Sequence, residues 1–183
     1  MFQVESEILS QHAVLGLLAT TVNGHGRLME PPGRGSMWRF VDTNELLTPH
    51  KDKIQIAYTD NGLNCGGLDY QVSQGGKCGV CGDGFGEAQP RPHEDGGKYG
   101  LGIVSKRYAP GEIMHTRSQI TAHHKGWIEW KLCPHTDGMS ADDLQTCLDS
   151  NLLEISGSGT RYYLGKKSIL KRLCVILNFS RHR

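Results

Sequence analysis

The sequence contains no apolar run long enough to cross a membrane as a helix. Such a span needs about 20 consecutive apolar residues, whereas the apolar stretch nearest a terminus, AVLGLLATTV, covers only residues 13–22. Internal repeats are also absent. With 37% hydrophobic and 21% charged residues in a chain of 183, the composition instead predicts one soluble globular domain with a core of its own.

The first 24 residues contain no lysine or arginine and carry two acidic residues, Glu5 and Glu7. A secretory signal peptide usually starts with a positively charged region, so this absence argues against one. However, residues 13–22 have the length of a signal-peptide core, and small or neutral residues precede His25 as a cleavage site requires. We therefore predict a signal peptide over residues 1–24, cut between Gly24 and His25. The alternatives are a helix over this segment or an artefact of the gene model.

Cysteine is abundant. The chain has six cysteines, which suit a secreted, disulfide-bonded protein better than a cytosolic one: Cys65, Cys78, Cys81, Cys133, Cys147 and Cys174. Six cysteines allow 15 complete pairings, and the sequence alone does not choose among them.

The motif Cys78-Gly-Val-Cys81 has the sharpest local spacing. It can provide two half-disulfides, act as a redox pair, or bind zinc together with Cys65 and either His93 or Cys133. No second CxxC motif completes a zinc site. We favour structural disulfides.

Glycine, at 24 residues, favours turns and loops over long helices. We expect an extended, looping segment over residues 26–39, an irregular one over 40–64, and a long disulfide-pinned loop over 64–100. Runs rich in β-branched residues or alternating in polarity predict strands at 101–108, 118–121 and 126–133. One short helix is expected over 140–150, because Ser140 can cap it and Asp143 follows three residues later. Short strands, long loops and one helix together indicate a β-sandwich.

Three histidines stand out as candidate metal ligands. His123 and His124 follow a predicted strand, where two exposed turn residues are the ordinary interpretation, and neighbours on a strand point to opposite faces. If His25 is the first mature residue, its α-amine and Nδ1 can chelate one ion in a six-membered ring. One further imidazole would complete a planar three-nitrogen set of the kind that suits copper.

Five segments together resemble the animal-type lytic polysaccharide monooxygenases, also described as chitin-binding type-4 domains. They occur in order along residues 25–163: HGRLMEPPGRGSMWR, NCGG, GGKCGVCGD, GGKYGLGIVSKRYAPGE and ITAHHKGWIEWKLCP. The resemblance implies a fibronectin- or immunoglobulin-like β-sandwich with a flat, exposed copper face. It also implies a secreted, monomeric enzyme that binds crystalline chitin or, as second choice, cellulose, and that has no nucleic-acid or membrane partner.

The same resemblance assigns residue roles. His25 would bind copper through its amine and Nδ1, His124 would supply the third nitrogen, and Ala122 would be the small residue beside the metal. His123 is not assigned to the metal. The implied activity is oxidative cleavage of glycosidic bonds with an external electron donor. The alternative is a secreted chitin-binding protein that keeps the fold without a complete active site.

Two regions depart from the family. Residues 40–57 differ from its pattern, and the resemblance stops near Tyr163, before the aromatic residue that the family places at the axial side of copper. Residues 161–183 carry seven basic residues and no acidic one, and we interpret 164–183 as a divergent C-terminal tail. We therefore expect weak or no oxidative activity and, unless Cys174 takes the place of a missing partner, a free thiol. We also expect Cys133 and Cys147 to form a disulfide, because the short connection lets the helix fold back on the preceding strand.

Overall fold

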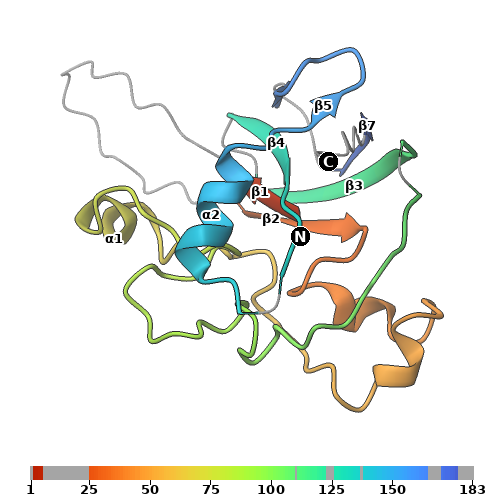
Figure 1. The fold of residues 1–183 in the computed structure, drawn as a ribbon, viewed down its shortest axis with the longest axis horizontal. Helices are drawn as coiled ribbons and strands as arrows, with labels where there is room; N and C mark the ends of the chain where they lie inside the picture. Colours follow the sequence, from red (N-terminus) through yellow and green to blue (C-terminus); the bar gives the residue numbers. More distant parts are fainter. Residues whose placement is uncertain are drawn as a thin grey trace.

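A computed structural model describes residues 2–5, 25–109, 111–122, 126–136, 138–164 and 170–176, the first and last of these segments by backbone alone. The fold is mainly β, as the sequence predicts, and its strands form two antiparallel sheets (Figure 1). The four-stranded sheet has the order β2 (His25–Glu30), β3 (Ile113–Ala122), β7 (Leu170–Ile176), β5 (Glu154–Ile155). The three-stranded sheet has the order β1 (Phe2–Glu5), β4 (Trp127–Leu132), β6 (Tyr162–Tyr163).

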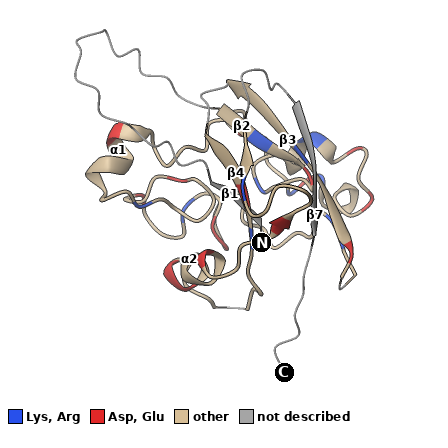
Figure 2. Ribbon diagram, turned by 90° about the horizontal axis from the view of Figure 1, so that it is seen from above, with Lys and Arg blue, Asp and Glu red and all other residues tan. Residues whose placement is uncertain are grey.

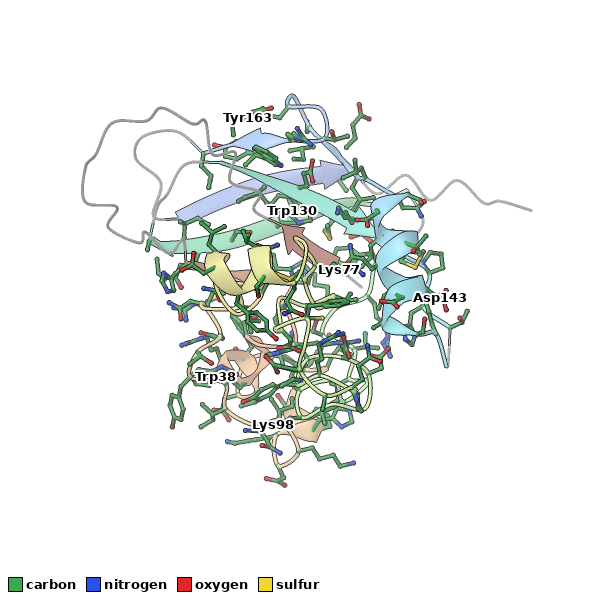
Figure 3. The ribbon with its side chains drawn as sticks, turned by 90° about the vertical axis from the view of Figure 1, so that its left-hand side faces the viewer. Trp38, Lys77, Lys98, Trp130, Asp143 and Tyr163 are labelled. Atoms are coloured by element: carbon green, nitrogen blue, oxygen red, sulfur yellow. A yellow bond between two sulfur atoms is a disulfide. The ribbon has the colours of Figure 1, made fainter. Side chains whose placement is uncertain are left out.

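The main core lies between the two sheets. Met114 of β3 packs with Ile128 and Trp130 of β4, and Leu153 and Ile155 complete the buried cluster. Trp130 is fully buried among the strands (Figure 3). Inward-facing residues from both sheets therefore form one apolar layer, which is how a β-sandwich is stabilised.

Strand β4 is buried on both faces. The sequence predicts its alternation, with Ile128 and Trp130 facing one way and Glu129 and Lys131 facing the other. The structure buries the charged face as well, at 6% and 5% exposure. Each charge has a partner there: Glu129 accepts from Arg161 at 2.6 Å, and Lys131 donates to Asp149 at 2.7 Å. Pairing offsets the cost of taking these charges out of water.

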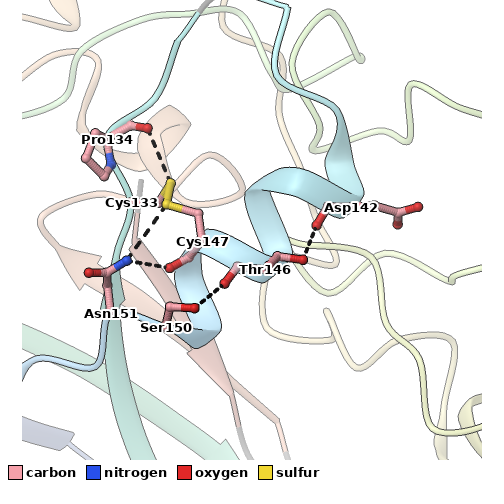
Figure 4. Close-up of a disulfide and its surroundings, with 7 residues drawn as sticks. All are labelled: Cys133, Pro134, Asp142, Thr146, Cys147, Ser150 and Asn151. Atoms are coloured by element: carbon pink, nitrogen blue, oxygen red, sulfur yellow. Dashed lines mark hydrogen bonds between the residues drawn. A yellow bond between two sulfur atoms is a disulfide. The ribbon is translucent and has the colours of Figure 1, made fainter.

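Helix α2 (Ala141–Asp149) follows β4 and begins where the sequence predicts. The hydroxyl of Ser140 accepts a hydrogen bond from the Asp143 amide at 3.1 Å, and Leu144 and Leu148 are buried. A disulfide joins Cys147 of α2 to Cys133 at the end of β4, the pair expected from the sequence (Figure 4). The cap and the disulfide together fix the helix against the sheet.

The long loop predicted over 64–100 contains a second helix, α1 (Leu68–Ser73), which the sequence analysis missed. Gly66 has φ 86°, and a Cβ there would lie 2.6 Å from the Tyr70 ring, so only glycine fits this turn. The disulfide Cys65–Cys78 closes the loop around the helix. Two 3-10 turns, η1 (Met37–Phe40) and η2 (Thr48–His50), lie in segments that were expected to be irregular.

The strand predicted over 101–108 does not form. This segment is held by side-chain hydrogen bonds in place of a strand ladder: Asn44 donates to the Ser105 carbonyl at 3.0 Å, and the Ser105 hydroxyl donates to the Pro32 carbonyl at 2.8 Å. Its β-branched composition therefore gave the wrong prediction.

Two strands lie in segments that were predicted to be outside the domain, as a signal peptide and a divergent tail. Strand β1 pairs with β4 from within the predicted signal peptide, with Phe2 opposite Leu132. Strand β7 lies in the predicted divergent tail and pairs with β3 on one side and β5 on the other. No helix in the described part of the chain is long and apolar enough to span a membrane.

Candidate active site

His25 is the first residue of β2, an edge strand that pairs antiparallel with β3. It is half-buried, and its Cα partner across the ladder is Ala122, the last residue of β3. His25, the predicted source of the amine and imidazole ligands, therefore lies beside Ala122, the small residue that was expected next to the metal. The predicted third ligand, His124, follows Ala122 by two positions in the chain. His123 and His124 themselves lie outside the described residues.

The ladder between β2 and β3 is irregular at this point. His25 pairs with Ala122 but Gly26 pairs with Ile120, so Thr121 is an extra residue opposite the step from His25 to Gly26. Such a bulge bends a strand and redirects a side chain, and bulges are common beside active sites. Here the Thr121 hydroxyl donates to the carbonyl of His25 at 3.3 Å.

A buried carboxylate anchors the loop beneath His25. The Asp60 side chain is fully buried and accepts hydrogen bonds from Arg27 at 2.5 Å and from Arg39 at 2.6 Å. Burial alone would raise the pKa of Asp60, but the hydrogen bonds from Arg39 and Arg27 outweigh it and hold the pKa below its ordinary value. Arg27 is two residues from His25, and Figure 2 shows basic residues on β2 and β3. The ion pairs thus tie β2 to this loop.

An exposed tyrosine and a half-buried tryptophan lie close together near the same loop. Tyr58 is 79% exposed, and its ring lies 6.1 Å from that of Trp38 in η1. The Arg39 guanidinium stacks 4.1 Å above the Trp38 ring while it also binds Asp60. Trp38 lies in the loop region, well away from Tyr163 of β6 (Figure 3). The exposed Tyr58 ring beside Trp38 therefore offers an apolar contact surface.

The cavity beside His25 has a volume of about 490 Å³. Its lining includes His25 and Ala122 from the two paired strands, together with Trp127, Ile128 and Leu164 from the opposite sheet. The cavity therefore runs from the candidate metal ligand into the space between the sheets.

The zinc alternative for the CxxC motif is wrong. Cys78 forms a disulfide with Cys65 and Cys133 forms one with Cys147, so three of the proposed sulfur ligands are unavailable to a metal. His93, the other proposed ligand, is buried and shares a hydrogen bond between its Nδ1 and Asp83 at 2.7 Å. Among the described residues, no group of three or more histidine, cysteine or acidic side chains could hold a metal.

Among the cysteines whose side chains the structure describes, Cys81 is the one outside a disulfide. Burial raises the pKa of its thiol to about 11, because the thiolate loses its hydration there. Arg34 opposes this rise, and the acidic groups nearby add to it. A thiol with so little thiolate character is a poor nucleophile and a poor redox partner at neutral pH. The redox interpretation of the CxxC motif therefore has no support here.

Residues 25–164 match the family model described as lytic polysaccharide mono-oxygenase, cellulose-degrading. The match begins at His25 and covers strands β2 to β6 and helix α2, but not β1 or β7. This chain belongs to the lytic polysaccharide monooxygenase family. A solved structure, "Lytic Polysaccharide Monooxygenase AA15 from Thermobia domestica in the Cu(I) State", matches with a TM-score of 0.71 and 38% sequence identity. The alignment covers 84% of this chain and 74% of that one. No curated protein matches the chain in sequence.

Among the residues that the structure describes, those at this site fit the copper ion that the family uses. His25 offers an imidazole that no described residue hydrogen-bonds, and nitrogen ligands of this kind suit copper. Ala122, its Cα partner across the ladder, has only a methyl side chain, and both residues line the same cavity. The sequence identified His25 as a possible first mature residue and Ala122 through the resemblance. It gave no signal for the Asp60 ion pairs or for the Thr121 bulge, because both depend on contacts between distant segments.

Proposed function

We propose that this chain is a copper-dependent lytic polysaccharide monooxygenase that cleaves glycosidic bonds of chitin, with cellulose as the second candidate. The observation that carries the proposal is the register of β2 on β3, which pairs His25 with Ala122. Two residues of chain span at most about 7 Å. Chain connectivity alone therefore keeps the Cα atom of His124 within about 7 Å of the Cα atom of Ala122, the residue that pairs with His25. The proposed ligand set is the α-amine and Nδ1 of His25 with one imidazole nitrogen of His124.

This ligand set requires a free amine on His25, and hence removal of residues 1–24. The match of the family model from residue 25 supports that boundary. Secretion would follow from the same cleavage, and the two disulfides of the described residues suit an oxidising compartment.

When copper is bound, it supplies one-electron chemistry with a reductant and an oxygen co-substrate at the polysaccharide surface. The protein's own residues provide three functions. The nitrogens of His25 and His124 bind the ion, the Ala122 methyl group leaves the space beside it open, and the Asp60 ion pairs hold β2 against the loop that carries Tyr58. The exposed Tyr58 ring offers an apolar surface on which a sugar ring of the polymer can lie.

The test uses protein that begins at His25, incubated with copper, ascorbate and either chitin or cellulose. We expect mass spectrometry to detect oxidised oligosaccharides, with a larger yield from chitin. Replacement of His25 or His124 by alanine should abolish these products, whereas His123→Ala should retain them. Binding to chitin without oxidised products from the wild-type protein would favour the alternative, a secreted chitin-binding protein without a complete active site.

A further inference from the structure

The peptide unit that joins His25 to Gly26 is held at both of its polar atoms. Its N–H group, on Gly26, donates to the carbonyl of Asn61 at 3.0 Å. Its C=O group, on His25, accepts from the Thr121 hydroxyl at 3.3 Å. The two partners come from different elements: Asn61 follows the buried Asp60 in the loop, and Thr121 is the extra residue of the β3 bulge.

These two partners are also joined to each other. The Asn61 side-chain amide donates to the Thr121 hydroxyl oxygen at 3.0 Å. Because that oxygen accepts the hydrogen bond from Asn61, the hydroxyl's own hydrogen is free to point toward the His25 carbonyl. The distance of 3.3 Å is long for a hydroxyl donor, so this bond is weak by itself and depends on Asn61 to orient it. The three groups form a closed bridge across the strand end.

The bridge restrains the part of β2 that is intrinsically most flexible. Residue 26 is glycine, and glycine permits wide rotation about its backbone. A side chain would be crowded here, because a Cβ on Gly26 would lie 3.0 Å from the end of the Ile120 side chain and 3.2 Å from the Gln119 carbonyl, so its neighbours would have to shift. Rotation about Gly26 would swing the whole of residue 25, including its amine and its imidazole. Hydrogen bonds to both sides of the preceding peptide oppose that rotation.

We propose that Thr121 and Asn61 are positioning residues that hold the His25 peptide so that its amine and imidazole meet one copper ion. This inference rests on the proposed function. Neither residue binds the metal. Instead, the bridge reduces the conformational freedom that His25 must lose on binding, which is how preorganisation raises affinity. The buried ion pairs of Asp60 keep the Asn61 end of the bridge fixed.

The test compares four variants of the protein that begins at His25. Thr121→Val keeps the shape of the side chain and removes its hydroxyl, Thr121→Ser restores a hydroxyl, and Asn61→Ala removes the amide donor. Thr59→Val is the matched control, because Thr59 is an exposed threonine of the same loop whose hydroxyl contacts no described residue. Thr121 is exposed, so its replacement should leave the unfolding midpoint nearly unchanged.

Two readouts are needed. The first is hydrogen exchange of the Gly26 amide in metal-free protein, which should become about threefold to tenfold faster in Thr121→Val and in Asn61→Ala. The second is copper(II) binding, by calorimetry and by electron paramagnetic resonance. Affinity should fall by a similar factor, and the spectrum should show a wider spread of copper environments. The double variant should be no worse than either single one, because both changes break the same bridge.

The Thr121→Ser and Thr59→Val variants should behave as wild type in both readouts. Unchanged Gly26 exchange and an unchanged copper spectrum in Thr121→Val would overturn the proposed positioning role. If wild-type protein bound no copper at His25, the proposed function would fail. In that case the Gly26 exchange would still decide whether the bridge holds the peptide.

Discussion

The Asp60→Asn substitution tests the ion pairs that anchor the candidate site. Asparagine keeps the size and one acceptor oxygen but removes the charge, so Arg27 and Arg39 lose their shared counter-ion. Breaking a buried ion pair by removing one partner costs about 3–5 kcal/mol. The two arginine side chains are 14% and 28% exposed and can recover part of their hydration, so we expect a loss of about 2 kcal/mol at pH 7.

The loss should depend on pH in a defined direction. The folded-state pKa of Asp60 is lowered, so its contribution is present above the unfolded-state pKa, about 3.9. It disappears as the pH falls from there through the lower folded-state pKa. The stability difference between wild type and Asp60→Asn should therefore be largest at neutral pH and should shrink in strong acid.

Urea unfolding of both proteins, at pH 7 and at several values below pH 4, measures this difference. Asp42→Asn is the matched control, because Asp42 pairs with Lys51 at the surface, where both side chains are more than half exposed. Such a pair contributes little, so no measurable change is expected. An equal loss for Asp60→Asn at every pH would show that the charge of the carboxylate is not what stabilises the loop.

Three further predictions concern the rest of the fold. Replacing Cys133 and Cys147 together by alanine should destabilise the protein by about 3 kcal/mol in chemical unfolding, since the bond closes a loop with a sequence separation of 14; a change below 1 kcal/mol would contradict this. Ser140→Ala should cost about 1 kcal/mol because α2 loses its N-cap, and an unchanged urea midpoint would argue against the cap. Cys81 should react with a maleimide much more slowly in the native protein than after unfolding, because it is half-buried and its pKa is raised to about 11. Rapid labelling of Cys81 in the native protein would contradict the structure.

Elements with strong local signals could be predicted from the sequence. Helix α2 has a capping serine and a periodic apolar face, and β4 has strict alternation, so both form where they were expected. Local composition failed where long-range contacts decide the structure. Residues 101–108 have strand-like composition, yet Asn44 and Pro32 supply the hydrogen bonds that hold them. Helix α1 is too short, and too closely surrounded by glycine and cysteine, for its periodicity to be visible.

The candidate site was predictable only in part for the same reason. Short motifs around His25 and Ala122 indicated the family, and the register of β2 on β3 brings these two residues together. The ion pair and the hydrogen bond that stabilise the site join residues far apart in the chain. Arg27 meets Asp60, and Thr121 meets Asn61, only after β2, β3 and the loop have assembled. No local pattern marks such pairs in a single sequence.

In the proposed site, the amine and imidazole of His25 bind copper together with His124. The most direct measurement is a copper(II) titration of protein that begins at His25, compared with the same protein extended by one alanine before His25. The extension keeps every side chain but moves the free amine away from the imidazole. We expect one copper ion per chain and a three-nitrogen paramagnetic resonance spectrum for the first protein, with a large loss of affinity for the second. Equal affinity and identical spectra for the two proteins would contradict the account.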